Sequence, residues 1–245
     1  MKTCNAIVAA TVLAAVSSAS AAIVASDNGS NYGGGWTNGS NGGTGFGAWS
    51  FSTSGGGFKG AYIGDPALKG ISGMSSSSFG LYANGGGGAT ISASRAFGAA
   101  LGIGDSFSMQ WGINWDSDFG GNKGFNLFAG TNEVINVNNG GNSDITVNGN
   151  NVGFGYGTNA MTWTFTQTTA TTVTVTANDR DGSGSYSAVI TVSGALSGFS
   201  IYASNMGDGG NREPFYNNFS INAVPTPGAL ALLGVAGIVG ARRRR

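Results

Sequence analysis

Two short acidic turns contain the residues best suited to bind a metal ion. Asp116 and Asp118 lie two apart in WDSDFGGNKG, and Asp179 and Asp181 lie two apart in NDRDGSG. Carboxylate oxygens in glycine-rich turns can surround a hard cation such as Ca²⁺. Asp and Gly are also ordinary turn residues, because they tolerate left-handed backbone. We expect no cofactor, with calcium as the alternative, and we take Asp116 and Asp118 as candidate ligand-binding residues because their turn ends a strong strand.

The chain lacks the side chains of the common nucleophilic enzymes. It has no histidine, and its one cysteine is Cys4, so Ser-His-Asp and Cys-His systems and the usual zinc sites are excluded. Glu133 and Glu213 are the two glutamates, and no dense acidic motif supplies the paired carboxylates of a glycosidase. The sequence therefore predicts a protein that is not an enzyme. Paired aspartates could still serve, which leaves a polysaccharide hydrolase or lyase as the second alternative.

Aromatic side chains in a glycine-rich stretch are the other candidate binding residues. Trp36 and Trp49 lie in NYGGGWTNGSNGGTGFGAW, where open loops could expose ring faces to a sugar. The favoured interpretation is that Trp49 belongs to the core and Trp36 covers one end of it, because large aromatic rings fill cores well. A lectin-like carbohydrate-binding module is accordingly the first alternative to a purely structural protein.

Composition excludes several classes of protein. Glycine accounts for 46 of 245 residues, without the G-X-Y period of collagen, and charged side chains for 9%. Between the two end segments, six basic side chains stand against eleven acidic ones, so we expect no nucleic-acid partner, which would need clustered positive charge. The 14 Phe, 7 Tyr and 5 Trp argue against disorder, because a disordered chain has no core for them to fill.

The elements that position these residues are predicted to be strands. In residues 107–115, apolar side chains at every second position alternate with small or polar ones, the period of a strand with one buried face: Phe107, Met109, Trp111, Ile113 and Trp115. MTWTFTQ repeats the pattern with Trp163 and Phe165, and residues 171–192 indicate a hairpin. Weaker segments of this kind are 46–53, 58–63, 79–83, 89–97, 124–129, 133–137, 144–148, 152–156, 198–204 and 215–222. Residues 22–223 are therefore predicted to form an all-β, two-sheet antiparallel β-sandwich or jelly roll, of which a concanavalin-like arrangement is one form.

The first 21 residues have the layout of a secretory signal peptide. A charged start at Lys2 precedes an apolar stretch from Ala6 to Val16, and small residues follow. Ala19 and Ala21 form an A-x-A site, with cleavage before Ala22. Residues 1–21 are therefore predicted to be a signal helix that is removed. The exported chain would then contain no cysteine and could not rely on disulfide bonds.

Residues 224–245 have three parts in a fixed order. They are the motif Val224, Pro225, Thr226, Pro227 and Gly228, an apolar run from Gly228 to Ala241 that shares its first residue with the motif, and the cluster Arg242, Arg243, Arg244 and Arg245. As a helix, the fourteen-residue apolar run spans about 21 Å, which is short for a hydrocarbon core of about 30 Å. The arginines would hold the end of the chain in the cytoplasm.

This segment resembles the PEP-CTERM sorting signals of Gram-negative bacteria, with Thr226 where the family's usual Glu stands. The resemblance implies a C-terminal apolar helix held transiently in the inner membrane and cleavage near the prolines by an exosortase. It also implies delivery to the cell surface or the extracellular matrix. The sequence as a whole thus predicts an exported, non-enzymatic protein with a structural or adhesive role, whose further partner would be an extracellular polysaccharide.

Overall fold

The computed structural model describes residues 21–85, 87–117, 120–141, 144–178 and 184–225. Residues 22–223 form one compact unit that contains fifteen strands, β1–β15, and three 3-10 turns at Gly29–Tyr32, Pro66–Lys69 and Gly210–Arg212. The expected all-β class is therefore confirmed. In the part of the chain that the structure describes, no helix has the length and apolar character needed to cross a membrane.

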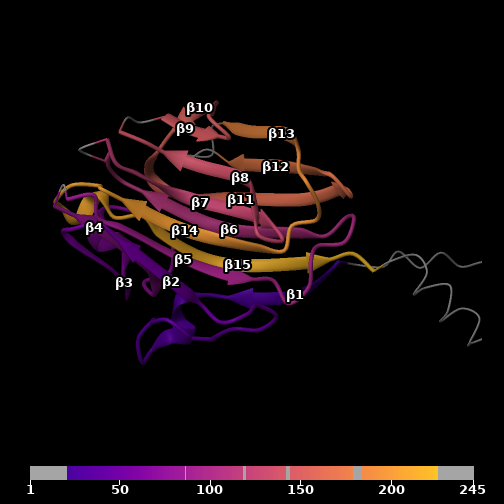
Figure 1. Ribbon diagram of the computed structural model, residues 1–245, viewed down its shortest axis with the longest axis horizontal. Coiled ribbons are helices and arrows are strands. Elements are labelled where there is room, and N and C mark those ends of the chain that lie inside the picture. Colours follow the sequence, from indigo (N-terminus) through magenta and orange to yellow (C-terminus); the bar gives the residue numbers. More distant parts are fainter. Residues whose placement is uncertain (1–20, 86, 118–119, 142–143, 179–183, 226–245) are drawn as a thin grey trace, which may run out of the picture. The chain divides into compact units, whose positions relative to one another are not determined.

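The strands form two antiparallel sheets (Figure 1), as predicted. The first sheet has the order β13-β12-β11-β6-β15-β4-β3. β1 also belongs to this sheet: β4 pairs with the first residues of β15, and β1 pairs with its last ones. Its strands are β1 (Ala22–Asp27), β3 (Phe58–Gly64), β4 (Ser78–Asn84), β6 (Ser106–Ile113), β11 (Gly157–Thr169), β12 (Thr172–Asn178), β13 (Ser185–Thr191) and β15 (Phe215–Ala223).

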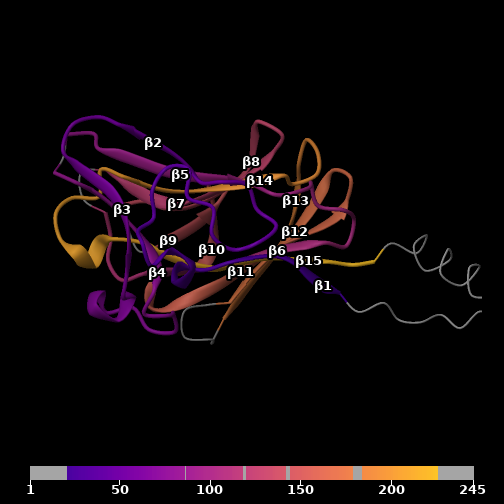
Figure 2. The same cartoon turned by 90° about the horizontal axis from the view of Figure 1, so that it is seen from below.

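The second sheet has the order β10-β9-β8-β7-β14-β5-β2. Its strands are β2 (Ser50–Ser54), β5 (Thr90–Ala96), β7 (Asn122–Ala129), β8 (Asn132–Asn139), β9 (Asp144–Val147), β10 (Asn150–Gly155) and β14 (Gly198–Ser204). The view in Figure 2 separates the layers, with β5 and β14 in one and β6 and β15 in the other. The protein is a β-sandwich of the jelly-roll kind.

The core lies between the two sheets and is rich in aromatic rings. Phe107 of β6 stacks on Phe199 of β14 with ring centroids 4.9 Å apart, and Trp111 meets Phe125 of β7 edge-on at 5.4 Å. Aromatic pairs at these separations stabilise a core beyond the burial of their area. The rings thus join residues that face each other from opposite sheets.

The predicted register of β6 is confirmed over most of its length. Phe107, Met109, Trp111 and Ile113 are fully buried, whereas the residues between them, apart from Gly112, are half-buried. The prediction is wrong at Trp115, which is 50% exposed. The strand ends at Ile113, and the chain then bends, so the alternation of faces no longer holds.

Candidate functional site

The predicted acidic turn at Asp116 lies beside a buried lysine. Lys123 of β7 is fully buried, and its amine donates hydrogen bonds to the carbonyl oxygens of Trp115 and of Arg212. Burial lowers the pKa of Lys123 to about 7; the charge of Asp116 opposes this shift and that of Arg212 adds to it. Asp116 therefore interacts with a basic group of the protein itself.

The other predicted metal-binding aspartates, Asp118, Asp179 and Asp181, lie outside the described residues. Among the residues that are described, no group of three or more His, Cys, Asp or Glu side chains is arranged to hold a metal ion. Ala19 and the segment from Thr226 onward also lie outside the described residues, whereas Ala21, Val224 and Pro225 flank the β-sandwich.

Trp36 and Trp49 lie in the core and present no open face to a sugar. Their exposed fractions are 3% and 1%, and their ring centroids are 5.1 Å apart in an edge-on contact. The indole N–H of Trp49 donates to the hydroxyl of Tyr32 at 2.9 Å. The favoured interpretation, in which both residues fill the core, therefore holds, and their rings leave little surface for a sugar to stack on.

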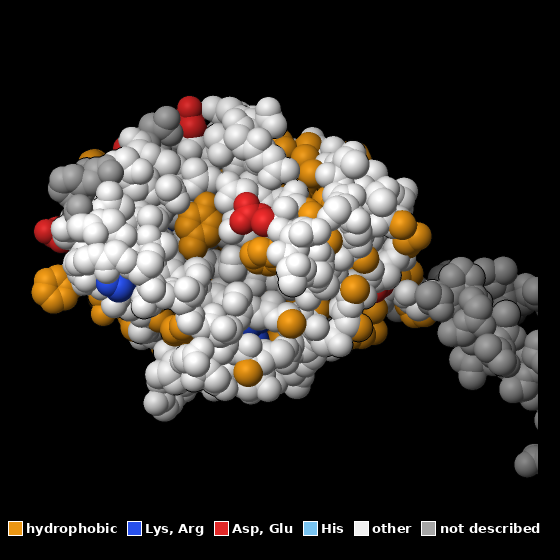
Figure 3. Space-filling model, viewed as in Figure 1, with side chains coloured by type: hydrophobic (Ala, Val, Ile, Leu, Met, Phe, Trp, Pro, Cys, Tyr) orange, Lys and Arg blue, Asp and Glu red, His pale blue; other side chains and the backbone are white. Residues whose placement is uncertain are grey.

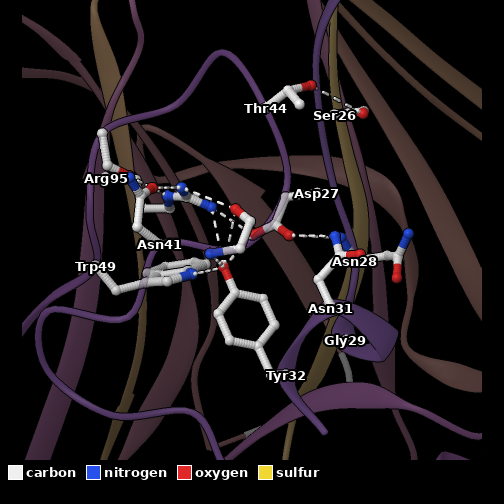
Figure 4. A network of polar contacts seen from close by, with 12 residues as sticks. Ser26, Asp27, Asn28, Gly29, Asn31, Tyr32, Asn41, Thr44, Trp49 and Arg95 are labelled. Carbon is white, nitrogen blue, oxygen red and sulfur yellow. Dashed lines mark hydrogen bonds and ion pairs between the residues drawn. The ribbon is translucent and has the colours of Figure 1, made fainter.

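A buried network of polar contacts surrounds Trp49 (Figure 4). The Asp27 carboxylate pairs with the Arg95 guanidinium and accepts hydrogen bonds from the Tyr32 hydroxyl at 2.6 Å and the Asn31 amide at 2.8 Å. Arg95 also donates to the carbonyl of Gly47 at 2.6 Å. Burial, followed by the bond to Asp27, raises the pKa of Tyr32 to about 12. Because its charged groups already bond to one another and to the chain, the network fixes the loop between β1 and β2 and is not a ligand site.

The outward face of the second sheet presents rows of hydroxyl and amide side chains. In one row Ser52, Ser92, Tyr202, Gly124 and Asn138 lie side by side on β2, β5, β14, β7 and β8. In the next row the neighbours are Ser50, Ser94, Ser200, Asn126 and Asn136. The side of the molecule shown in Figure 3 carries few acidic or basic side chains.

A shallow groove of about 380 Å³ lies on this face. We call it the amide groove; its lining residues are Asn122, Asn126, Glu133, Asn136, Asn138 and Tyr202. The Asn136 side-chain amide donates to Asn126 Oδ1 at 2.7 Å and to the Tyr202 hydroxyl at 3.0 Å. That hydroxyl in turn donates to Asn138 Oδ1 at 2.8 Å. The four side chains thus hold one another in fixed positions.

These bonds leave one half of each asparagine amide for a ligand. Among the described residues, no hydrogen bond engages Asn126 Nδ2, Asn136 Oδ1 or Asn138 Nδ2. An amide nitrogen donates and an amide oxygen accepts. The groove therefore offers donors and an acceptor side by side next to the aromatic ring of Tyr202.

Gly124 makes room for the tyrosine at the centre of the groove. A Cβ at this position would lie 1.9 Å from the carbonyl oxygen of Val137 and 2.8 Å from the Tyr202 hydroxyl. Both separations are far below van der Waals contact, so no other residue fits without moving β8 or Tyr202. Burial, and then the charge of Glu133, raises the pKa of Tyr202, so the phenol keeps its proton at neutral pH.

No protein-family model and no curated protein matches the sequence. The solved structures to which this chain is similar include the CBM2 module of the Lactobacillus casei BL23 phage J-1 evolved Dit, at 13% identity and a TM-score of 0.41, covering 56% of this chain and 70% of that one. Another is the ligand binding domain of botulinum neurotoxin serotype D in complex with N-acetylneuraminic acid. The identity is 10% and the TM-score 0.41, and the match covers 77% of this chain and 46% of that one. A third is the alginate lyase from Corynebacterium sp., at 11% identity and a TM-score of 0.36, covering 56% of this chain and 75% of that one. This chain spans less than half of the toxin structure, and similarities this remote carry no argument about its function.

Proposed function

We propose that this chain is an exported, non-enzymatic β-sandwich with a structural or adhesive role, and that it attaches to a neutral extracellular polysaccharide through the amide groove. The observation that carries the proposal is the fixed set of amide donors and acceptors around Tyr202. Each sugar hydroxyl both donates and accepts, so neighbouring hydroxyls fit alternating amide groups. The ring of Tyr202 adds apolar surface for a sugar face.

The charge of the groove and of the protein favours a neutral glycan over an anionic one. Glu133 is the one charged side chain among the described residues that line the groove. Acidic side chains also outnumber basic ones, eleven to six, between the two end segments. Both features would repel a polymer of uronic acids or sulfated sugars.

The same groove argues for binding rather than hydrolysis. Hydrolysis of a glycosidic bond normally needs two carboxyl groups about 5–10 Å apart, one on each side of the bond. Within the described lining the groove supplies the carboxyl group of Glu133 and no second one. A polysaccharide would therefore be held without being cleaved.

The two ends of the chain support export and sorting. Residues 1–21 have the order of a signal peptide, and residues 224–245 resemble the PEP-CTERM signal. We place the protein at the cell surface or in the extracellular matrix after processing by an exosortase-type enzyme. Its contact with the inner membrane would be transient, because the apolar run is short for a permanent anchor.

Binding to soluble polysaccharides tests the proposal. Affinity would be measured for neutral glucans and mannans and for an anionic polyuronate, using wild type, Tyr202→Ala, Asn136→Ala and the control Thr162→Ala on the outer face of the first sheet. We expect a neutral polymer to bind, with a loss of about tenfold in the two groove variants and none in the control. Binding of the polyuronate alone, equal loss in the control, or release of shorter chains during incubation would each contradict the proposal.

A further inference from the structure

The free edge of the first sheet is a regular, uncharged strand. β13 has the sequence SYSAVIT, and each of its seven residues pairs with β12 in one unbroken register. It is the terminal strand of its sheet, so within the described residues its other side pairs with no strand. An edge of this kind presents unpaired N–H and C=O groups to any extended chain that approaches.

The hydrogen-bond pattern shows which backbone groups point outward. The Val192 N–H donates to the Thr171 carbonyl at 2.9 Å, on the same ladder that joins β12 to β13. Antiparallel ladders alternate, so residues 190, 188 and 186 also bond toward β12. The outward groups therefore belong to four residues whose side chains are all exposed: Ser185, Ser187, Val189 and Thr191.

The other edges of the sandwich are protected. β10 has an irregular register at Gly153, and β3 carries the charged Lys59. The edge of β2 begins beside a loop that bonds to the backbone, since the Phe51 N–H donates to Asn38 Oδ1 at 2.9 Å. Bulges, charges and covering loops are the devices by which proteins prevent pairing at sheet edges. β13 has none of the three among its described residues.

We propose that β13 is a self-association edge that pairs antiparallel with the β13 of a second copy of this chain. A two-fold axis opposite Ala188 sets Ser187 against the partner's Val189 and Ser185 against the partner's Thr191. In this register every outward N–H and C=O finds an acceptor or donor, and the same surface serves both copies. The absence of charge on the strand allows two identical edges to approach without repulsion. Val189, 67% exposed, is covered in the process.

The mass of the protein in solution as a function of concentration tests this inference, with the full chain kept in one mild detergent throughout. Wild type should form a dimer whose fraction rises with concentration. Val189→Lys places an ammonium at the edge and should weaken the dimer at least about tenfold. Thr162→Lys adds the same charge to an exposed position of β11, away from any edge, and should leave the dimer unchanged.

A pair of complementary variants tests the register. Ser187→Glu alone should also weaken the dimer, whereas a mixture of Ser187→Glu with Val189→Lys should restore it as a heterodimer, because the two charges then lie opposite each other. Circular dichroism would establish that each variant is folded. A wild type that stays monomeric at all concentrations, equal weakening by Thr162→Lys, or no recovery in the mixture would overturn the proposal. None of these outcomes depends on glycan binding.

Discussion

The guanidinium of Arg95 and the carboxylate of Asp27 form an ion pair that is wholly excluded from solvent, since both side chains have an exposed fraction of 0%. Arg95 lies on β5 of the second sheet and Asp27 ends β1 of the first. The pair therefore connects the two layers of the sandwich through a charged contact, and the Arg95 guanidinium lies over the rings of Phe46 and Trp49.

Removing one partner of this pair should destabilise the fold strongly. Arg95→Met leaves Asp27 buried without its counter-charge, and we expect a loss of about 3–5 kcal/mol in the free energy of unfolding, measured by urea denaturation. Asp27→Asn should be destabilising as well. The double variant should lose less than the sum of the two single losses, because neither charge then remains unpaired. Additive losses would show that the two groups are not coupled.

The stability of the fold should rise with pH between about 7 and 10. Lys123 loses its proton near pH 7 in the folded chain but near 10.5 in the unfolded one, so over this range the unfolded state binds more protons. The gain should be on the order of 1 kcal/mol per pH unit. Above pH 10 the trend should reverse, because Tyr32 keeps its proton to about pH 12 only when folded. Unfolding titrations at several pH values should show the rise in wild type and a flatter profile in Lys123→Met.

Gly124→Ala should damage both the fold and the amide groove. The added methyl group would press on the Val137 carbonyl and on Tyr202, and overpacking of this kind typically costs about 1–3 kcal/mol. Gly194→Ala is a matched control in the loop after β13, where the nearest atom to a new Cβ is 3.8 Å away, and it should change stability by less than about 0.5 kcal/mol. Thermal unfolding and glycan binding would be measured on both. Equal behaviour of the two variants would contradict the crowding argument.

Processing in the native host should remove both end segments of the chain. Intact-mass measurement of the released protein should give an N-terminus at Ala22 and no residue after the Pro225–Pro227 motif. Replacing Pro225 and Pro227 with alanine should leave an uncut precursor in the membrane fraction, because the prolines keep the cleavage region extended. A surface form that still ends in Arg245 would show that the tail is a simple anchor.

Most of the fold could be predicted because strands with one buried face have a period of two. The pattern placed β6 and β14 within one or two residues of their ends. It did not reveal β1, because Ala22–Asp27 follows the apolar signal segment directly and lacks a clear alternation. Lys123 and Arg95 were not recognised as buried, although each lies in step with inward apolar residues of its own strand. A charged residue at a position where the alternation calls for an apolar one is the signal that could have revealed both.

The amide groove could not be predicted from local pattern. Its residues come from β7, β8 and β14. In the sequence, β14 lies about seventy residues after β7, but in the sheet the two strands are hydrogen-bonded neighbours. In the sequence, Asn126, Asn136 and Asn138 look like ordinary polar positions. Only the pairing of β14 with β7 brings Tyr202 beside them. Strand order in a sheet depends on long-range pairing, which a one-dimensional period does not contain.

The pairing of β1 with β15 brings Ala22 opposite Ala223, so the domain starts and finishes at one spot on its surface. A precursor held in the membrane by residues 1–21 and one held by residues 224–245 would therefore be attached at the same end of the sandwich. Both would expose the same faces of the sheets. Domains with adjacent ends also tolerate circular permutation and insertion into the loop of a host protein. This sandwich could accordingly be displayed on an unrelated scaffold as a closed module, with the amide groove and the β13 edge both accessible.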